Sequence, residues 1–174
     1  MAVKEIKDMA VSVLTRHKNQ SRETGVPYQV CLQLFAQEEF LRKLEKSKFN
    51  DNLILKGGMF LYTLTHFEGR PTMDIDFMIR HLSNELSNIE GVMNEICCVD
   101  TGNDFINISV LGTETITPEK EYPGVKTKFM AKIKNVRIPF SIDVGVDDVI
   151  ICGPVKRSVA SYKNYADDCK RKQL

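Results

Sequence analysis

Two short segments of this 174-residue chain alternate acidic with apolar residues, and this pattern requires a β-sheet that has one polar and one buried face. The segment 74–79 places Asp74 and Asp76 on the same face of a strand, because side chains two residues apart project the same way. The segment 138–144 does the same for Asp143, with isoleucines and phenylalanine on its other face. If the two strands pair, Asp143 joins the other two acids in one cluster.

The rest of the chain alternates between helical and extended patterns around these strands. Apolar periodicity and breakers predict helices over 3–18, 27–46, 59–67 and 84–97, and strands over 52–56, 105–111, 125–133 and 137–146. The polar residues 19–25 are expected to break the first helix. We therefore predict an α+β domain with a mixed or antiparallel sheet covered by helices on one face. Residues 1–155 would form this core with its N-terminal helices, and 156–174 a polar basic tail.

Composition supports a globular chain and does not identify its partner. Charged residues make up 27% and hydrophobic residues 43%, and the net charge is only +1, so a strong overall field for nucleic acid is absent. The five cysteines and three histidines lack the spacing of a zinc site. We expect His17, His66 and His81 at the surface or at helix ends. With neither a signal peptide nor a membrane-spanning run, the expected location is the cytoplasm.

Three carboxylates gathered at one site must be stabilised by a bound proton or a cation. Two unit charges 4 Å apart repel by about 4 kcal/mol at an effective dielectric of 20. Magnesium fits a site made only of oxygen ligands, completed by water and substrate phosphates, and we expect two such ions. An acidic pair on a strand is by itself weak evidence, because most such pairs are merely solvated.

A glycine pair precedes the acidic strand and indicates a phosphate-binding turn. Lys56, Gly57, Gly58 and Met59 lie between a predicted strand and a predicted helix. Glycine lets the backbone approach a ligand closely, and the free N–H groups of a helix N-terminus bind anions. The alternative is an ordinary turn.

Taken together, these motifs resemble the signature of the AbiEii/AbiGii toxin family, a branch of the DNA polymerase beta-like nucleotidyltransferase superfamily. The matching runs are LILKGG at 53–58, RPTMDIDF at 70–77, YPGV at 122–125 and IDVGVDDVI at 142–150. The resemblance covers roughly residues 20–154, and it implies a nucleotidyltransferase-like fold.

The resemblance also assigns roles to individual residues. It implies that Gly57 and Gly58 hold the triphosphate of a nucleotide, and that Asp74 and Asp76 bind magnesium. Asp143 would complete the metal site and is the expected proton acceptor. The implied reaction is nucleotidyl transfer from a nucleoside triphosphate to an acceptor, with pyrophosphate leaving.

Further positions match the family and also have simpler explanations. Lys56, Arg70 and Thr72 would bind nucleotide, but Lys56 could be a solvated lysine. Arg70 could pair with a neighbouring acid such as Glu68, and Thr72 could be a turn former. Asp148 matches a family acid that would support the metal ligands, unless it is a solvated strand end.

The chain departs from the family pattern at two places. Many superfamily members have serine where Met59 follows the glycines, and methionine cannot donate a hydrogen bond to phosphate. The relatives also continue beyond the third-acid strand, so this chain is expected to be a short or truncated form whose activity is open.

Three functions are therefore compared. The first is a magnesium-dependent nucleotidyltransferase that modifies RNA such as tRNA, acting as the toxin of a toxin–antitoxin, abortive-infection system with a cognate antitoxin. The second is a nucleotide-binding or antitoxin-binding remnant without activity. The third is a glycosyltransferase with a metal-binding Asp-x-Asp motif, which the upstream glycine turn and the downstream third acid argue against.

Overall fold

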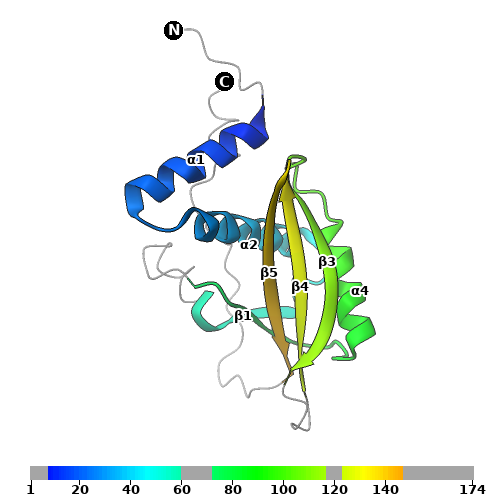
Figure 1. Cartoon of the computed structure of the whole chain (residues 1–174). Coiled ribbons are helices and arrows are strands. Elements are labelled where there is room, and N and C mark those ends of the chain that lie inside the picture. Colours follow the sequence, from blue (N-terminus) through cyan, green and yellow to red (C-terminus); the bar gives the residue numbers. More distant parts are fainter. Residues whose placement is uncertain (1–7, 60–71, 117–122, 147–174) are drawn as a thin grey trace.

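The computed structural model of the chain describes residues 8–59, 72–116 and 123–146 (Figure 1). The predicted helix over 59–67 and the basic tail over 156–174 lie outside the described residues, apart from helical Met59. No described helix is long and apolar enough to cross a membrane.

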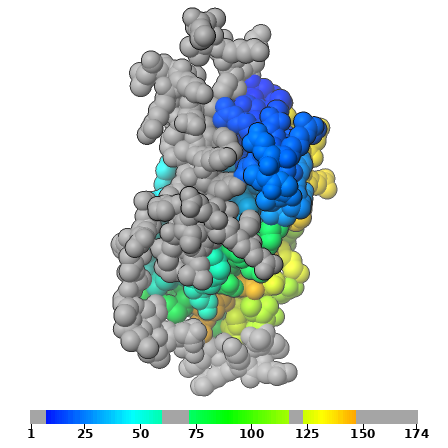
Figure 2. All heavy atoms as spheres, turned by 90° about the vertical axis from the view of Figure 1, so that its left-hand side faces the viewer, coloured from blue at the N-terminus to red at the C-terminus, as the bar shows by residue number. Residues whose placement is uncertain are grey.

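Helix α1 (Met9–Thr24) is longer at its C-terminal end than the sequence indicated. The expectation that residues 19–25 break the helix is wrong, because Gly25, with φ at 74°, ends it instead. The expectation that His17 is a surface residue is also wrong. His17 is fully buried, and its Nδ1 lies 3.2 Å from the Oε1 of Gln20, so these two polar residues face inward and contact each other. In Figure 2, α1 (blue) lies at the upper end of the coloured, described residues.

Helix α2 (Tyr28–Lys46) begins directly after Pro27, as predicted, and is the most deeply buried helix among the described residues. It supplies Phe40 to the centre of the core, where the Phe40 ring centroid lies 5.2 Å from that of Phe129 and 6.4 Å from that of Phe77. Phe129 in turn stacks on Phe140 with centroids 5.0 Å apart. These rings join α2 to three strands of the sheet.

The five strands form one mixed sheet in the order β1-β2-β5-β4-β3. Their bounds are Leu53–Lys56 for β1, Ile75–Ile79 for β2, Asn107–Ile116 for β3, Gly124–Ile133 for β4 and Val136–Gly145 for β5. β2 and β5 are parallel, and the other neighbouring pairs are antiparallel. β3 continues past the predicted end because the register shifts between Val110, which pairs with Phe129, and Gly112, which pairs with Lys128. Leu111 has no register partner, so the strand accommodates it as a bulge and continues.

Helix α2 and the helix after β2 lie against one face of this sheet, and α1 packs on α2, which confirms the predicted α+β architecture (Figure 1). Helix α4 (Leu86–Cys97) packs on β3 and β4 through Ile89, Met93 and Ile96, which are fully buried, and α2 packs on β5. The opposite face therefore carries the polar residues of the alternating strands.

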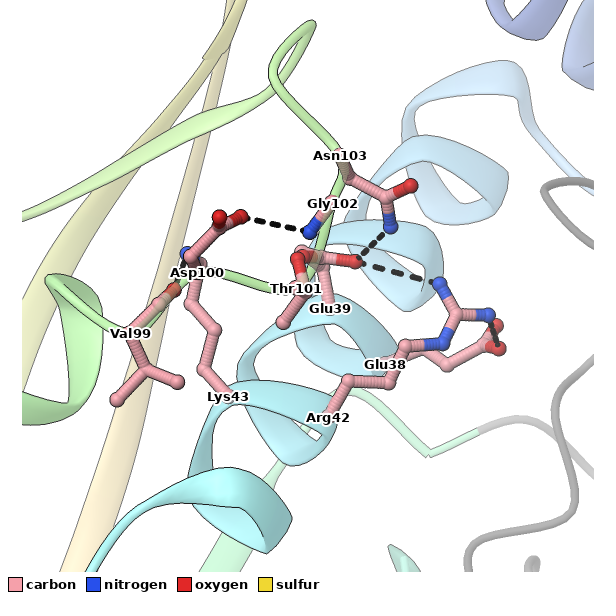
Figure 3. Close-up of polar contacts among 9 residues, drawn as sticks. All are labelled: Glu38, Glu39, Arg42, Lys43, Val99, Asp100, Thr101, Gly102 and Asn103. Carbon is pink, nitrogen blue, oxygen red and sulfur yellow. Dashed lines mark hydrogen bonds and ion pairs between the residues drawn. The ribbon is translucent and has the colours of Figure 1, made fainter.

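A buried carboxylate connects α2 to the loop that leads into β3 (Figure 3). Glu39 is fully buried and accepts hydrogen bonds from the Thr101 hydroxyl and, at 2.7 Å, from Asn103 Nδ2. Arg42 on the next turn of α2 lies 3.2 Å from a Glu39 oxygen. The Glu39 charge is thus both paired and hydrogen-bonded, as a buried charge requires.

Candidate active site

Two of the predicted acids lie side by side at the centre of the sheet. β2 and β5 are parallel neighbours, and Asp76 is the register partner of Asp143. The residues beside them, Ile75 and Ile142, are also register partners and are buried, so the acids lie on the sheet face opposite the core. The expected pairing of the two strands is confirmed by this register.

A lysine flanks this acidic pair on each side. On β1, Lys56 is the register partner of Asp76, and on β4, Lys126 is the register partner of Asp143. The Lys126 ammonium lies 3.4 Å from Asp143 Oδ1. Sequence analysis did not select Lys126, although its alternation with buried Val125 and Thr127 would have placed it on the polar face.

The electrostatics of the pair favour binding of a positive charge. Burial and, second, the neighbouring Asp143 charge raise the pKa of Asp76 above its ordinary value, while Lys56 acts in the opposite direction. Asp143 Oδ1 is buried and receives no hydrogen bond from the described residues, even though Lys126 is within ion-pair distance. The Lys126 contact thus supplies charge without hydrogen-bond geometry, and this oxygen remains available to a further cation or proton.

Asp74 is placed differently from the other two acids. It lies one residue before β2 and is exposed. Its backbone nitrogen lies 3.4 Å from the Thr72 hydroxyl oxygen, which accepts a hydrogen bond from it. Within the described ranges, no three His, Cys, Asp or Glu side chains are grouped so that they could hold a metal ion. The acidic site in this structure is therefore a pair with a third acid beside it.

The glycine turn lies directly against the acids. Gly57 follows β1 with φ at +69°, and a Cβ built on it would lie 2.6 Å from Asp76 Oδ2. A Cβ on Gly58 would lie 3.1 Å from the Thr72 hydroxyl oxygen. Residues 57–59 are already helical, so the free N–H groups of this turn begin a helix, as a phosphate-binding turn requires. Glycine is needed here because a side chain would meet the acidic strand.

The remaining predicted residues have mixed outcomes. Lys56 is half-buried. Its Nζ lies beside Gly145, 3.5 Å from the place that a Cβ on this glycine would take, so the ammonium group is close to the end of β5 and to the acids. Met59 is buried at 3% exposure and points into the core, so it is a packing residue here. Arg70 and Asp148 lie outside the described residues.

Comparison with known protein families finds a match that spans the site. A sequence model described as "Nucleotidyl transferase AbiEii toxin, Type IV TA system" matches residues 39–166. The chain belongs to the AbiEii nucleotidyltransferase toxin family. No curated protein and no solved structure matches it significantly.

The AbiEii match includes the glycine turn, the acidic strand and the strand of the third acid. The predicted family and the predicted class of a toxin–antitoxin nucleotidyltransferase are thereby confirmed. The AbiEii assignment also implies a nucleoside triphosphate substrate and an antitoxin partner.

Proposed function

We propose that this chain transfers a nucleotidyl group from a nucleoside triphosphate to an RNA acceptor such as tRNA, in a magnesium-dependent reaction in the cytoplasm. The observation that carries the proposal is the register pairing of Asp76 with Asp143 beneath the Gly57 turn. The acids that would bind a cation and the turn that would bind phosphate lie in contact, and nucleotidyl transfer needs both groups at one site.

The chemistry of the acids fits magnesium. Asp76 and Asp143 offer only oxygen ligands, one of the Asp143 oxygens is buried without a hydrogen bond from the described residues, and the pKa of Asp76 is raised by burial and by Asp143. Asp74 would complete the site from the exposed end of the same segment. Magnesium, when bound, would neutralise charge that develops on the reacting phosphoryl group and its neighbours.

The chain's own groups then have distinct tasks in the transfer. The N–H groups of the Gly57–Gly58 turn would bind the triphosphate, with Lys56 beside them and Arg70 and Thr72 as further contacts. The acceptor hydroxyl oxygen forms a bond to the α-phosphorus while the bond to the pyrophosphate oxygen breaks. Asp143 would take the hydroxyl proton, since its buried Oδ1 is an available acceptor.

The direct test is transfer of label from each α-labelled nucleoside triphosphate to total tRNA in the presence of magnesium. We expect labelled tRNA with wild type, none after chelation by EDTA, and at least a hundredfold lower rate with Asp74→Asn or Asp76→Asn. The exposed Asp104→Asn variant is the matched control and should retain the wild-type rate.

Two outcomes would contradict the proposal. Tight nucleotide binding without transfer to any RNA would favour the inactive-remnant alternative. Binding of a sugar nucleotide with transfer of the sugar would favour a glycosyltransferase.

A further inference from the structure

Two glutamine side chains of α2 meet at one backbone carbonyl directly in front of the acidic strand. Gln37 Nε2 donates to the Met73 carbonyl oxygen at 2.8 Å, and Gln33 Nε2 donates to the same oxygen at 3.3 Å. Because the glutamines are four residues apart, they lie on one side of the helix on successive turns. A carbonyl oxygen accepts two hydrogen bonds, so these donors fill it.

The burial of Gln37 shows that this arrangement is not a surface contact. Gln37 is fully buried, and its Oε1 has no hydrogen-bond partner among the described residues. An apolar side chain of the same length would avoid burying that unpaired acceptor. The donation to Met73 is therefore the interaction that distinguishes glutamine from an apolar residue at this position.

The contacted peptide leads directly into the candidate site. The Met73 carbonyl and the Asp74 N–H belong to one peptide unit, and Asp74 precedes β2, so it lacks the ladder bonds that fix Asp76. On its other side, among the residues that the structure describes, this unit has the long contact of 3.4 Å between Asp74 N and Thr72 Oγ1. Among the described hydrogen bonds of this peptide unit, those from the two glutamines are thus shorter and more deeply buried than the one to Thr72.

We propose that Gln33 and Gln37 are positioning residues of the transferase site, which set the direction of the Asp74 carboxylate relative to Asp76 by holding the Met73–Asp74 peptide. The inference rests on the proposed function for its kinetic consequence. Catalysis falls steeply when reacting groups are misplaced by about 1 Å, so a loosened Asp74 would slow turnover more than it weakens nucleotide binding.

Methionine substitutions test this proposal, because methionine has a similar length and cannot donate a hydrogen bond. The set comprises Gln33→Met, Gln37→Met, the double variant, and Gln20→Met as a control on α1. Gln20 is also a buried glutamine, but it contacts His17 rather than the acidic segment. For each protein, kcat and KM for the nucleoside triphosphate, amide hydrogen exchange and urea unfolding are measured.

Because both donors share one acceptor, their effects should be coupled. We expect the double variant to lower kcat at least tenfold with KM changed less than twofold. Gln33→Met should lower kcat more in the Gln37→Met background than in wild type. Amide exchange at Asp74 and Ile75 should accelerate in the double variant, and Gln20→Met should leave kcat unchanged.

The proposal is overturned if the double variant keeps the wild-type kcat, or if the two substitutions act independently. It is also overturned if exchange at Asp74 and Ile75 does not change. If the wild-type protein transfers no nucleotide, the proposed function fails, whereas the exchange measurement still decides whether the glutamines hold this peptide.

Discussion

Gly57 and Gly25 have nearly the same backbone conformation, with φ at 69° and 74°, but only Gly57 touches the candidate site. A Cβ on Gly25 would meet nothing within 4 Å, whereas one on Gly57 would lie 2.6 Å from Asp76 Oδ2. The two positions therefore separate the backbone requirement for glycine from the requirement imposed by the acids.

Gly25→Ala and Gly57→Ala form a matched pair. Each substitution places alanine in the left-handed region, which costs about 1–2 kcal/mol. Gly57→Ala should in addition displace Asp76 and reduce nucleotidyl transfer at least tenfold, while Gly25→Ala should leave transfer unchanged. Urea unfolding and the labelled-tRNA assay measure the two effects, and equal activity of the two variants would show that Gly57 is needed only for its turn.

His17 predicts a specific pH dependence of stability. Burial lowers its pKa from 6.5 to about 4, against the opposing effect of the Gln20 hydrogen bond. As the pH falls, His17 binds a proton in the unfolded chain before it does so in the folded protein. The contribution of neutral His17 to the free energy of unfolding is therefore fully present above pH 6.5 and is lost as the pH falls towards 4. The loss should be about 2 kcal/mol by pH 5.

His17→Phe should remove this dependence, because phenylalanine cannot titrate and can still pack on Phe35, whose ring centroid lies 5.0 Å from that of His17. The measurement is the free energy of unfolding from urea titrations at pH 7 and pH 5. A wild-type change no larger than that of the variant would mean that His17 titrates normally.

At the scale of elements, α2 connects three parts of the molecule. Its glutamines hold the Met73 carbonyl, Phe40 packs on the sheet, and Glu39 holds Thr101 in the loop before β3. Lys43 adds a hydrogen bond of 2.5 Å to the Val99 carbonyl of the same loop. The polar residues of α2 thus determine where the loop and the acidic segment lie.

Glu39→Ala should be strongly destabilising. It leaves Arg42 without one of its partners and removes the acceptor of Thr101 and Asn103, and breaking a buried ion pair costs about 3–5 kcal/mol. Glu45→Ala on the exposed side of α2 should change stability by less than about 0.5 kcal/mol. Urea unfolding of both variants provides the test, and similar losses would show that the Glu39 contacts contribute little.

For the molecule as a whole, the acidic pair links ligand binding to stability. Because the folded-state pKa of Asp76 is raised above 3.8, the folded protein binds this proton more tightly than the unfolded chain. The free energy of unfolding should therefore decrease as the pH rises from 3.8 through the raised pKa, and the penalty is fully present above it.

Asp76→Asn should therefore raise the Tm of the metal-free protein at pH 7. Magnesium with a nucleoside triphosphate should raise the Tm of wild type and leave that of the variant unchanged, because a ligand stabilises only the state that binds it. Differential scanning calorimetry measures both shifts. A metal-free variant clearly less stable than wild type would contradict the electrostatic account of the site.

Local pattern alone determined much of this protein. Alternation along the strands predicted which residues of β2 and β5 face the core, and Pro27 predicted the start of α2, because both signals depend on a few neighbouring residues. The motif at Gly57 and the acids led to the AbiEii family, which the comparison confirmed.

Tertiary structure decided what depends on contacts between distant segments. Four features join residues that are far apart in the chain or on facing elements. They are the register of Asp76 with Asp143, the ion pair of Lys126, the burial of His17 and the hydrogen bond from Gln37 to Met73. Such contacts depend on which strands pair and on which side of a helix faces the sheet. Local periodicity restricts these choices but does not determine them, because the free energy of packing is gained only when the whole core is assembled.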